Sequence, residues 1–216
     1  MSGPALILAN GAPPKRRLLR KARSIADIFV CADGGANIAA ALNEQPDLII
    51  GDLDSIKSAT VKKFKKVKTR RIADQNSTDL EKALLWAIRK GYDEIMVLGA
   101  TGGRVDHLTS NLSALGKFSR KARIRFVDDL GVMMAVGSEL TFHAMEGTTV
   151  SLIPLSRCEG IVTNGLKWEL KNSVLEPGVR ESTSNAVRSS PVSVKVRRGT
   201  LLLYKLTNSG KRERIS

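Results

Sequence analysis

Four short segments of the sequence concentrate aspartate, asparagine, glycine and hydroxyl side chains. These segments are Asp33–Asn37 (DGGAN), Gly51–Ser55 (GDLDS), Asp74–Asp79 (DQNSTD) and Gly99–His107 (GATGGRVDH). Carboxylate oxygens are the ligands that Mg²⁺ prefers, usually together with water and substrate phosphates. Glycines at a helix start let backbone N–H groups approach phosphate oxygens, and an arginine such as Arg104 adds a charge-assisted contact. The residue types indicate a magnesium site for a phosphorylated ligand.

Each segment taken alone also has an ordinary structural explanation. Aspartate is common in turns, so Asp52 and Asp54 by themselves are weak evidence. Asp79 could serve only to stabilise the start of a helix, and Asp106 could be a helix cap. His107, in a first helical turn, is as often structural as catalytic. The argument for function therefore depends on whether the fold brings the four segments together.

The apolar pattern of the first 130 residues predicts an α/β domain with a mostly parallel sheet flanked by helices. Apolar runs without alternation are typical of strands buried on both faces, and helix-like stretches separate them. The expected strands are Ala5–Leu8, Ile28–Ala32, Leu48–Ile50, Val67–Thr69, Ile95–Leu98 and Ile124–Val127, and the expected helices lie near 15–24, 36–43, 58–65, 78–90 and 106–118. Ligands of such sheets bind outside the carboxyl ends of the strands, where we expect all four polar segments to gather.

The stretch 78–90 carries the clearest helix signals. Its apolar residues recur at three- and four-residue steps, Thr78 and Glu81 form a capping-box pattern, and Gly91 is placed to end the helix. Asp79 therefore falls in the first turn, where the helix dipole favours a carboxylate.

After Asp128 the sequence pattern changes. Short β-branched runs separated by Gly, Ser, Pro and Asn predict an antiparallel all-β domain of the sandwich type. The expected strands are Val132–Val136, Glu139–Phe142, Thr149–Ile153, Gly160–Thr163, Val192–Val196 and Thr200–Leu206. We place the boundary so that the α/β domain is 1–130 and the β-sandwich is 131–216.

Composition and missing motifs exclude several other classes of protein. Cys31 and Cys158 have no partner at metal-binding spacing, so we expect no zinc site. GxxxxGK[ST] and an early GxGxxG are absent, which disfavours P-loop enzymes and dinucleotide oxidoreductases. No apolar run is long enough to span a bilayer, and the N-terminal charges follow the apolar stretch instead of preceding it. We therefore expect a cytoplasmic protein that does not bind membranes.

The formal charge of +14 raises the possibility of nucleic-acid binding. The basic residues crowd into Lys15–Arg23 and Lys57–Arg71, but only 4% of the chain is aromatic, and these runs hold a single aromatic residue, Phe64, instead of the interleaved aromatics of a base-stacking platform. Solvated helix faces are the simpler interpretation. We do not expect nucleic acid as a partner, and we keep it as the alternative from another functional class.

Six segments, in order from about Ala5 to Leu206, resemble the motifs of thiamine pyrophosphokinases. They are Cys31–Asn37, Pro46–Ile56, Asp74–Asp79, Gly102–His107, Gly165–Trp168 and Ser182–Asn185. The resemblance implies transfer of diphosphate from ATP to the hydroxyethyl group of thiamine, giving thiamine diphosphate and AMP, with Mg²⁺ as cofactor. It also implies a homodimer with the active site at the subunit interface, in which the α/β domain binds ATP and Mg²⁺ and the β-sandwich binds thiamine and dimerises.

The resemblance also implies a role for individual residues. The catalytic residues would be Asp54, Gln75 and Asp79. The Mg²⁺ ligands would be Asp33, Asp52, Asp54 and Asp79. The ATP contacts would be Asp33, Gly34, Gly35, Asn37, Ser77, Thr78, Lys82, Gly103, Arg104, Asp106 and His107. The thiamine contacts would be Gln75, Trp168, Ser182, Ser184 and Asn185.

Some features leave alternatives open. Asp74-Gln75-Asn76 replaces the DxD-like start found in many bacterial members, so the number of metal carboxylates in that loop is open. Trp168 offers a flat surface for a cationic ring, but it could also be a core residue of the β-domain. A pyrophosphokinase for another hydroxymethyl heterocycle, such as a pterin, is the alternative enzyme.

Overall fold

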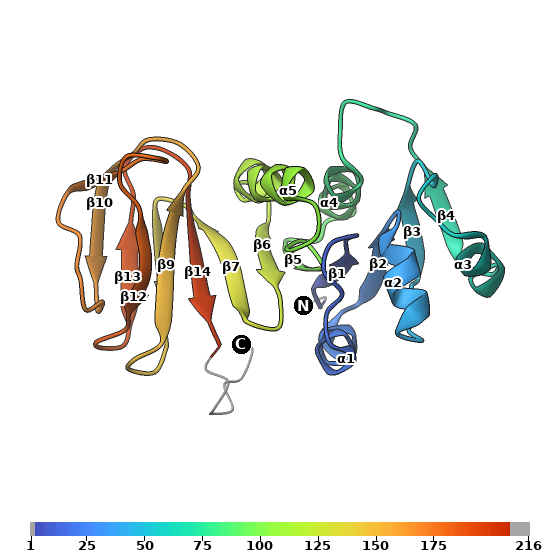
Figure 1. Cartoon of the computed structure of the whole chain (residues 1–216), viewed down its shortest axis with the longest axis horizontal. Coiled ribbons are helices and arrows are strands. Elements are labelled where there is room, and N and C mark those ends of the chain that lie inside the picture. Colours follow the sequence, from blue (N-terminus) through green and yellow to red (C-terminus); the bar gives the residue numbers. More distant parts are fainter. Residues whose placement is uncertain (1–2, 208–216) are drawn as a thin grey trace. The chain divides into compact units, whose positions relative to one another are not determined.

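The computed structural model describes residues 3–207, and the chain divides into two units, Met1–Asp129 and Leu130–Ser216 (Figure 1). The first unit is built on a parallel sheet with the strand order β6-β5-β1-β2-β3-β4. Its strands are β1 (Ala5–Leu8), β2 (Ile28–Ala32), β3 (Leu48–Gly51), β4 (Lys68–Arg71), β5 (Glu94–Leu98) and β6 (Arg123–Val127). The parallel sheet predicted from the continuous apolar runs is confirmed.

Five helices connect these strands and pack on the sheet, as Figure 1 shows. They are α1 (Arg16–Ile25), α2 (Gly35–Ala41), α3 (Ser58–Lys63), α4 (Asp79–Arg89) and α5 (Val105–Phe118). The predicted capping box is present, because Thr78 Oγ1 accepts from the backbone N–H of Glu81 at 3.3 Å and Glu81 Oε2 accepts from the N–H of Thr78 at 3.1 Å. Gly91 follows the helix with φ of 88°, a left-handed conformation that glycine tolerates. These contacts fix the first turn of α4, which carries Asp79.

The edge strand β4 departs from the apolar pattern of the others. We expected it at Val67–Thr69, whereas it runs from Lys68 to Arg71 with all four residues exposed. A strand at the edge of a sheet has less surface to bury, and charged side chains there discourage pairing with other chains.

The second unit contains two antiparallel sheets, ordered β12-β9-β14-β7 and β11-β10-β13-β8. Its strands are β7 (Gly131–Val136), β8 (Glu139–Phe142), β9 (Thr149–Pro154), β10 (Cys158–Asn164), β11 (Ser173–Leu175), β12 (Ser182–Ala186), β13 (Val192–Lys195) and β14 (Leu201–Leu206). Residues of both sheets, among them Leu152, Ile161, Val194 and Leu203, form one apolar core. This is the second, antiparallel sheet domain that the alternating sequence predicted.

Two strands of this unit, β11 and β12, were not predicted. The sequence of β12, Ser182–Ala186, is polar and contains a register irregularity, so it lacks the alternation of a half-buried strand. Across residues 3–207, no helix combines the length and the apolar character needed to cross a membrane.

Candidate active site

A cavity of about 330 Å³ lies in the first unit and is lined by residues from all four polar segments. Its lining consists of Ala9, Asn10, Gly11, Ala32, Asp33, Gly34, Asp52, Ser55, Gln75, Ser77, Thr78, Asp79, Leu80, Lys82, Gly102, Arg104, His107 and Asn111. Most of these residues follow the carboxyl ends of parallel strands or open the next helix. The expected convergence of the four segments at one edge of the sheet is therefore observed.

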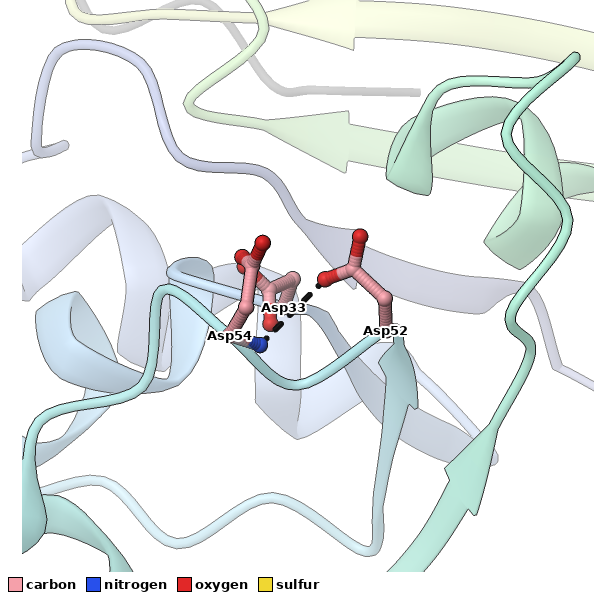
Figure 2. Close-up of side chains that lie close together, drawn as sticks. All are labelled: Asp33, Asp52 and Asp54. Carbon is pink, nitrogen blue, oxygen red and sulfur yellow. Dashed lines mark hydrogen bonds between the residues drawn. The ribbon is translucent and has the colours of Figure 1, made fainter.

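Three carboxylates meet beside this cavity. Asp33, Asp52 and Asp54 each offer an oxygen, and these oxygens all lie within 4.8 Å of one another (Figure 2). Asp33 follows β2 and the other two follow β3, and these neighbouring strands run in register with Ala32 opposite Ile50. We call these three residues the carboxylate cluster.

Gly51 allows the two loops of the carboxylate cluster to approach each other. A Cβ atom at Gly51 would lie 2.7 Å from the Cβ of Asp33, closer than real Cβ atoms come, and 3.1 Å from Asp79 Oδ1. The backbone N–H of Asp33 also donates to the carbonyl of Ile50 at 2.7 Å. The glycine before the Asp-x-Asp pair is therefore required by close packing of the two loops.

The environment of the carboxylate cluster fits a divalent cation. Asp33 is 2% exposed, and among the residues that the structure describes its Oδ1 is a buried side-chain oxygen with no hydrogen-bond partner. Burial raises the pKa of Asp33. The negative charges of Asp79 and Asp52 raise it further, whereas hydrogen bonds from Ser55 and from the N–H of Gly34 lower it. The backbone N–H of Asp54, 3.3 Å from Asp52 Oδ1, lowers the pKa of Asp52. A buried, unpaired carboxylate oxygen beside an ionised one is a donor set suited to Mg²⁺.

Asp79 lies in the same cavity but makes a different contact. Its Oδ1 accepts from Lys82 Nζ at 3.0 Å, and this lysine side chain is only 4% exposed. Both residues stand on the first turn of α4, three positions apart, where side chains share one helix face. Asp79 is outside the group of three carboxylates, so its part in metal binding stays a prediction.

The loop before α5 supplies glycines and an arginine to the cavity. Gly102 and Gly103 both have φ of 72°, and Arg104 is the N-cap residue of α5. The Arg104 guanidinium donates to both oxygens of Asp106, at 3.1 and 2.6 Å, and lowers the pKa of Asp106 to about 2. Asp106 therefore holds, by two hydrogen bonds, the arginine that lines the cavity.

Several residues with a predicted ATP role lie outside the cavity lining. They are Gly35, Asn37, Gly103 and Asp106, and the predicted metal ligand Asp54 also lies outside it. Asn37 Nδ2 donates to the carbonyl of Ser55 at 2.9 Å, and its Oδ1 accepts from the N–H of Lys57 at 3.0 Å. In this structure the Asn37 amide anchors the loop that carries Asp52 and Asp54.

Asn10, Gly11 and Asn111 also line the cavity, although they were not among the site residues predicted from the sequence. Asn10 and Gly11 follow β1, so the rule that placed the other loops at the carboxyl edge of the sheet could have found them. Asn111 stands four residues after His107 on α5, a spacing that puts both on one face of the helix. Gly11 is also fixed by packing, because its Cβ position lies 2.4 Å from the carbonyl oxygen of Gly99.

The predicted thiamine residues of the second unit gather around β12. Trp168 is 58% exposed and is therefore not a core residue, whereas Asn185 is 3% exposed. Ser184 is exposed with φ of 56°, and Ser182 is half-buried. The fifth residue of that set, Gln75, lines the cavity of the first unit.

Comparisons with known proteins match both units. Residues 19–127 match the family described as thiamin pyrophosphokinase, catalytic domain, and residues 138–201 match its vitamin B1 binding domain. The chain belongs to the thiamine pyrophosphokinase family. It is 34% identical to thiamin pyrophosphokinase 1 of Caenorhabditis elegans over 76% of this chain and 72% of that protein. It is 31% identical to thiamine pyrophosphokinase 1 of rice (Oryza sativa subsp. japonica) over 78% of this chain and 75% of that protein.

Solved structures of the thiamine pyrophosphokinase family have the same fold. Thiamin pyrophosphokinase from Geobacillus thermodenitrificans superposes with a TM-score of 0.80 at 25% identity, covering 95% of this chain and 98% of that one. The Candida albicans enzyme superposes with a TM-score of 0.82 at 19% identity, over 95% of this chain and 90% of that one, which supports the fold alone.

Proposed function

We propose that this chain is a thiamine pyrophosphokinase, which transfers the diphosphate of ATP to the hydroxyethyl group of thiamine and releases AMP. The observation that carries the proposal is the carboxylate cluster of Asp33, Asp52 and Asp54 beside the sheet-edge cavity, in a chain whose two units match the two domains of this family. Neither a pterin substrate nor nucleic-acid binding is supported by these comparisons.

The cofactor in this proposal is Mg²⁺, held by the carboxylate cluster, with Asp79 as a further candidate ligand. When bound, the ion would offset negative charge on the phosphate oxygens. Arg104 and Lys82, which line the same cavity, supply positive charge to the phosphates of ATP. Ser77 and Thr78, which are half-buried, and His107, which is exposed, line the same cavity and offer further polar groups to the phosphates.

The reaction requires attack of the thiamine hydroxyl oxygen on the β-phosphorus of ATP. A new oxygen–phosphorus bond forms, the bond from the β-phosphorus to the oxygen that bridges it to the α-phosphorus breaks, and AMP leaves with the electron pair of that bond. The hydroxyl proton must be accepted by a base, and we assign this role to Asp79, with Gln75 orienting the hydroxyl. Positioning and charge stabilisation supply most of the remaining rate enhancement.

To the same proposal belong contacts of thiamine with Trp168, Ser182 and Ser184, a homodimer with a shared active site, and a cytoplasmic location. Light scattering would test the dimer, and cell fractionation would test the location. The reaction itself is tested by identifying the products formed from thiamine, ATP and Mg²⁺. AMP and thiamine diphosphate in equal amounts are expected, whereas ADP or thiamine-independent nucleotide release would overturn the proposal.

A further inference from the structure

Trp168 is an exposed aromatic residue held at the end of a short irregular segment, Gly165–Trp168, which follows β10. Its side chain is 58% exposed, although an indole ring normally gains free energy from burial. The Lys167 ammonium lies 4.7 Å from the centre of the ring and covers one face of it. A flat ligand would therefore stack on the opposite face.

The backbone of Trp168 is fixed by one side chain, that of Asn185. The N–H of Trp168 donates to Asn185 Oδ1 at 3.1 Å, and Asn185 Nδ2 donates to the carbonyl of Trp168 at 2.7 Å. The same Oδ1 accepts from the N–H of Ala186 at 2.8 Å. Because Asn185 is 3% exposed, these bonds are shielded from water, and losing them would leave buried polar groups unpaired.

An irregularity in β12 turns Asn185 inward. Ser182 pairs with Leu152 and Asn185 pairs with Val150, so three steps along β12 match two steps along β9. The extra residue leaves Ser184 in the left-handed region with φ of 56°, and its N–H donates to Ser151 Oγ at 3.0 Å. Bulges of this kind re-aim side chains, and a non-glycine residue in this conformation is retained only where the surroundings require it.

We propose that Asn185 is a positioning residue that clamps the backbone of Trp168, so that the indole is a preorganised platform for the flat heterocycle of the substrate. This differs from the direct contact with thiamine that the family resemblance implies for Asn185. Both polar atoms of its amide are engaged, Oδ1 with the N–H groups of Trp168 and Ala186 and Nδ2 with the carbonyl of Trp168, and its burial leaves little surface for a ligand. The substrate part of the inference rests on the proposed function, whereas the clamp itself does not.

The first test measures the mobility of the indole without substrate. The sequence contains two tryptophans, Trp86 and Trp168, so a Trp86→Phe background makes the emission report Trp168 alone. In that background we expect Asn185→Ala to lower the fluorescence anisotropy of Trp168 and to raise its quenching by acrylamide. The matched control is Thr183→Ala, on the same strand but exposed, which should change neither quantity. Unchanged anisotropy in a folded Asn185→Ala protein would overturn the clamp.

Asn185→Asp guards against failure of the alanine variant to fold. Aspartate keeps an acceptor for the N–H of Trp168 but removes the donor to its carbonyl, so an intermediate anisotropy is expected. An anisotropy equal to that of the unmodified protein in both variants would contradict the proposal.

The second test is a double-mutant cycle on the KM for thiamine. Asn185→Ala should raise this KM by about tenfold, with kcat and the KM for ATP within about twofold. In a Trp168→Ala protein, adding Asn185→Ala should raise the KM for thiamine no further, because a clamp with no ring to hold has no effect on binding. If the fold-changes in the KM for thiamine caused by the two substitutions instead multiplied, Asn185 would contact the substrate directly and the proposal would be overturned. If the wild-type chain does not turn over thiamine at all, the proposed function fails, and the anisotropy test still decides the clamp.

Discussion

Lys82 and Asp79 form an ion pair inside the cavity of the first unit, with Lys82 Nζ 3.0 Å from Asp79 Oδ1 and the lysine side chain 4% exposed. A buried ammonium group is stable only with an opposite charge at hydrogen-bond distance. The charge of Lys82 also lowers the pKa of Asp52, after the larger effect of the Asp54 backbone N–H. Lys82 therefore compensates part of the negative charge that the aspartates bring to this edge of the sheet.

Replacing Lys82 should damage both stability and activity. Lys82→Met leaves the partly exposed Asp79 carboxylate without its partner, and we expect the free energy of unfolding to fall by about 1–3 kcal/mol. We also expect kcat/KM for ATP to fall by at least about tenfold, because a cation beside the phosphates is lost. Urea unfolding and steady-state kinetics measure the two effects.

The matched control is Lys117→Met, which removes an exposed lysine that bonds Glu81 Oε1 at 2.8 Å. Exposed pairs contribute less than about 1 kcal/mol, so this variant should stay close to wild type in both measurements. Equal losses in the two variants would show that burial of Lys82 has no special consequence.

The ionised Asp33 carboxylate should lower the stability of the metal-free protein and should be necessary for Mg²⁺ binding. Asp33→Asn removes a buried carboxylate and keeps a side chain that tolerates the φ of 40° at this position. We expect the variant to be more stable than wild type by about 1 kcal/mol without Mg²⁺ and to lose most of the Mg²⁺-dependent rise in Tm. Calorimetric scans with and without MgCl₂ measure both.

The stability gain in Asp33→Asn should depend on pH. Burial raises the pKa of Asp33, which means that the ionised carboxylate destabilises the folded wild-type protein. This destabilisation disappears as the pH falls through the raised pKa, because the carboxyl group then becomes neutral. Asp93→Asn, at an exposed position, is the control and should respond to Mg²⁺ as wild type does. A less stable Asp33→Asn protein with a full response to Mg²⁺ would contradict this prediction.

Glu81 should stabilise the helix that carries Asp79 in a pH-dependent way. Burial raises the pKa of Glu81, but hydrogen bonds from Lys117 and from the N–H of Thr78 outweigh this effect and hold the pKa below its ordinary value. Its contribution is therefore present above the pKa of the unfolded chain and is lost as the pH falls through the lower pKa of the folded state. Glu81→Gln keeps an acceptor for the capping box but removes the charge.

We expect Glu81→Gln to be about 0.5–1 kcal/mol less stable than wild type at pH 7, with the difference disappearing as the pH falls through the lowered pKa of Glu81. Urea unfolding followed by circular dichroism at several pH values would show this convergence. A difference that stays constant with pH would mean that the charge of Glu81 does not contribute.

The sequence was informative where one physical requirement dominates. Continuous apolar runs identify strands such as Ala5–Leu8 and Ile28–Ala32 with the bounds that the structure shows, because a strand covered on both faces must be apolar throughout. The topology of a parallel sheet then brings Asp33 close to Asp52 and Asp54, although Asp52 lies 19 positions after Asp33 along the chain.

Other features depend on tertiary contacts that leave no local pattern. The polar strand β12 is held by its pairing with β9 and by its buried Asn185, and neither gives an apolar alternation. A lysine in an amphipathic helix is normally exposed, so the helical pattern does not predict the burial of Lys82. Its burial depends on the ion pair with Asp79. The family resemblance implies ligand contacts for Asn37 and Asn185, and only the structure shows that their amides bond backbone groups elsewhere in the chain.

We propose that the carboxylate cluster supports diphosphate transfer by holding Mg²⁺. The most direct test compares wild type with Asp54→Asn and measures how AMP formation from ATP and thiamine depends on the Mg²⁺ concentration. Wild type should form AMP only when Mg²⁺ is present. The variant should unfold at a similar temperature yet form AMP at least about 100-fold more slowly at every Mg²⁺ concentration. Near-normal AMP formation by a folded Asp54→Asn protein, or ADP as the product of wild type, would contradict the account.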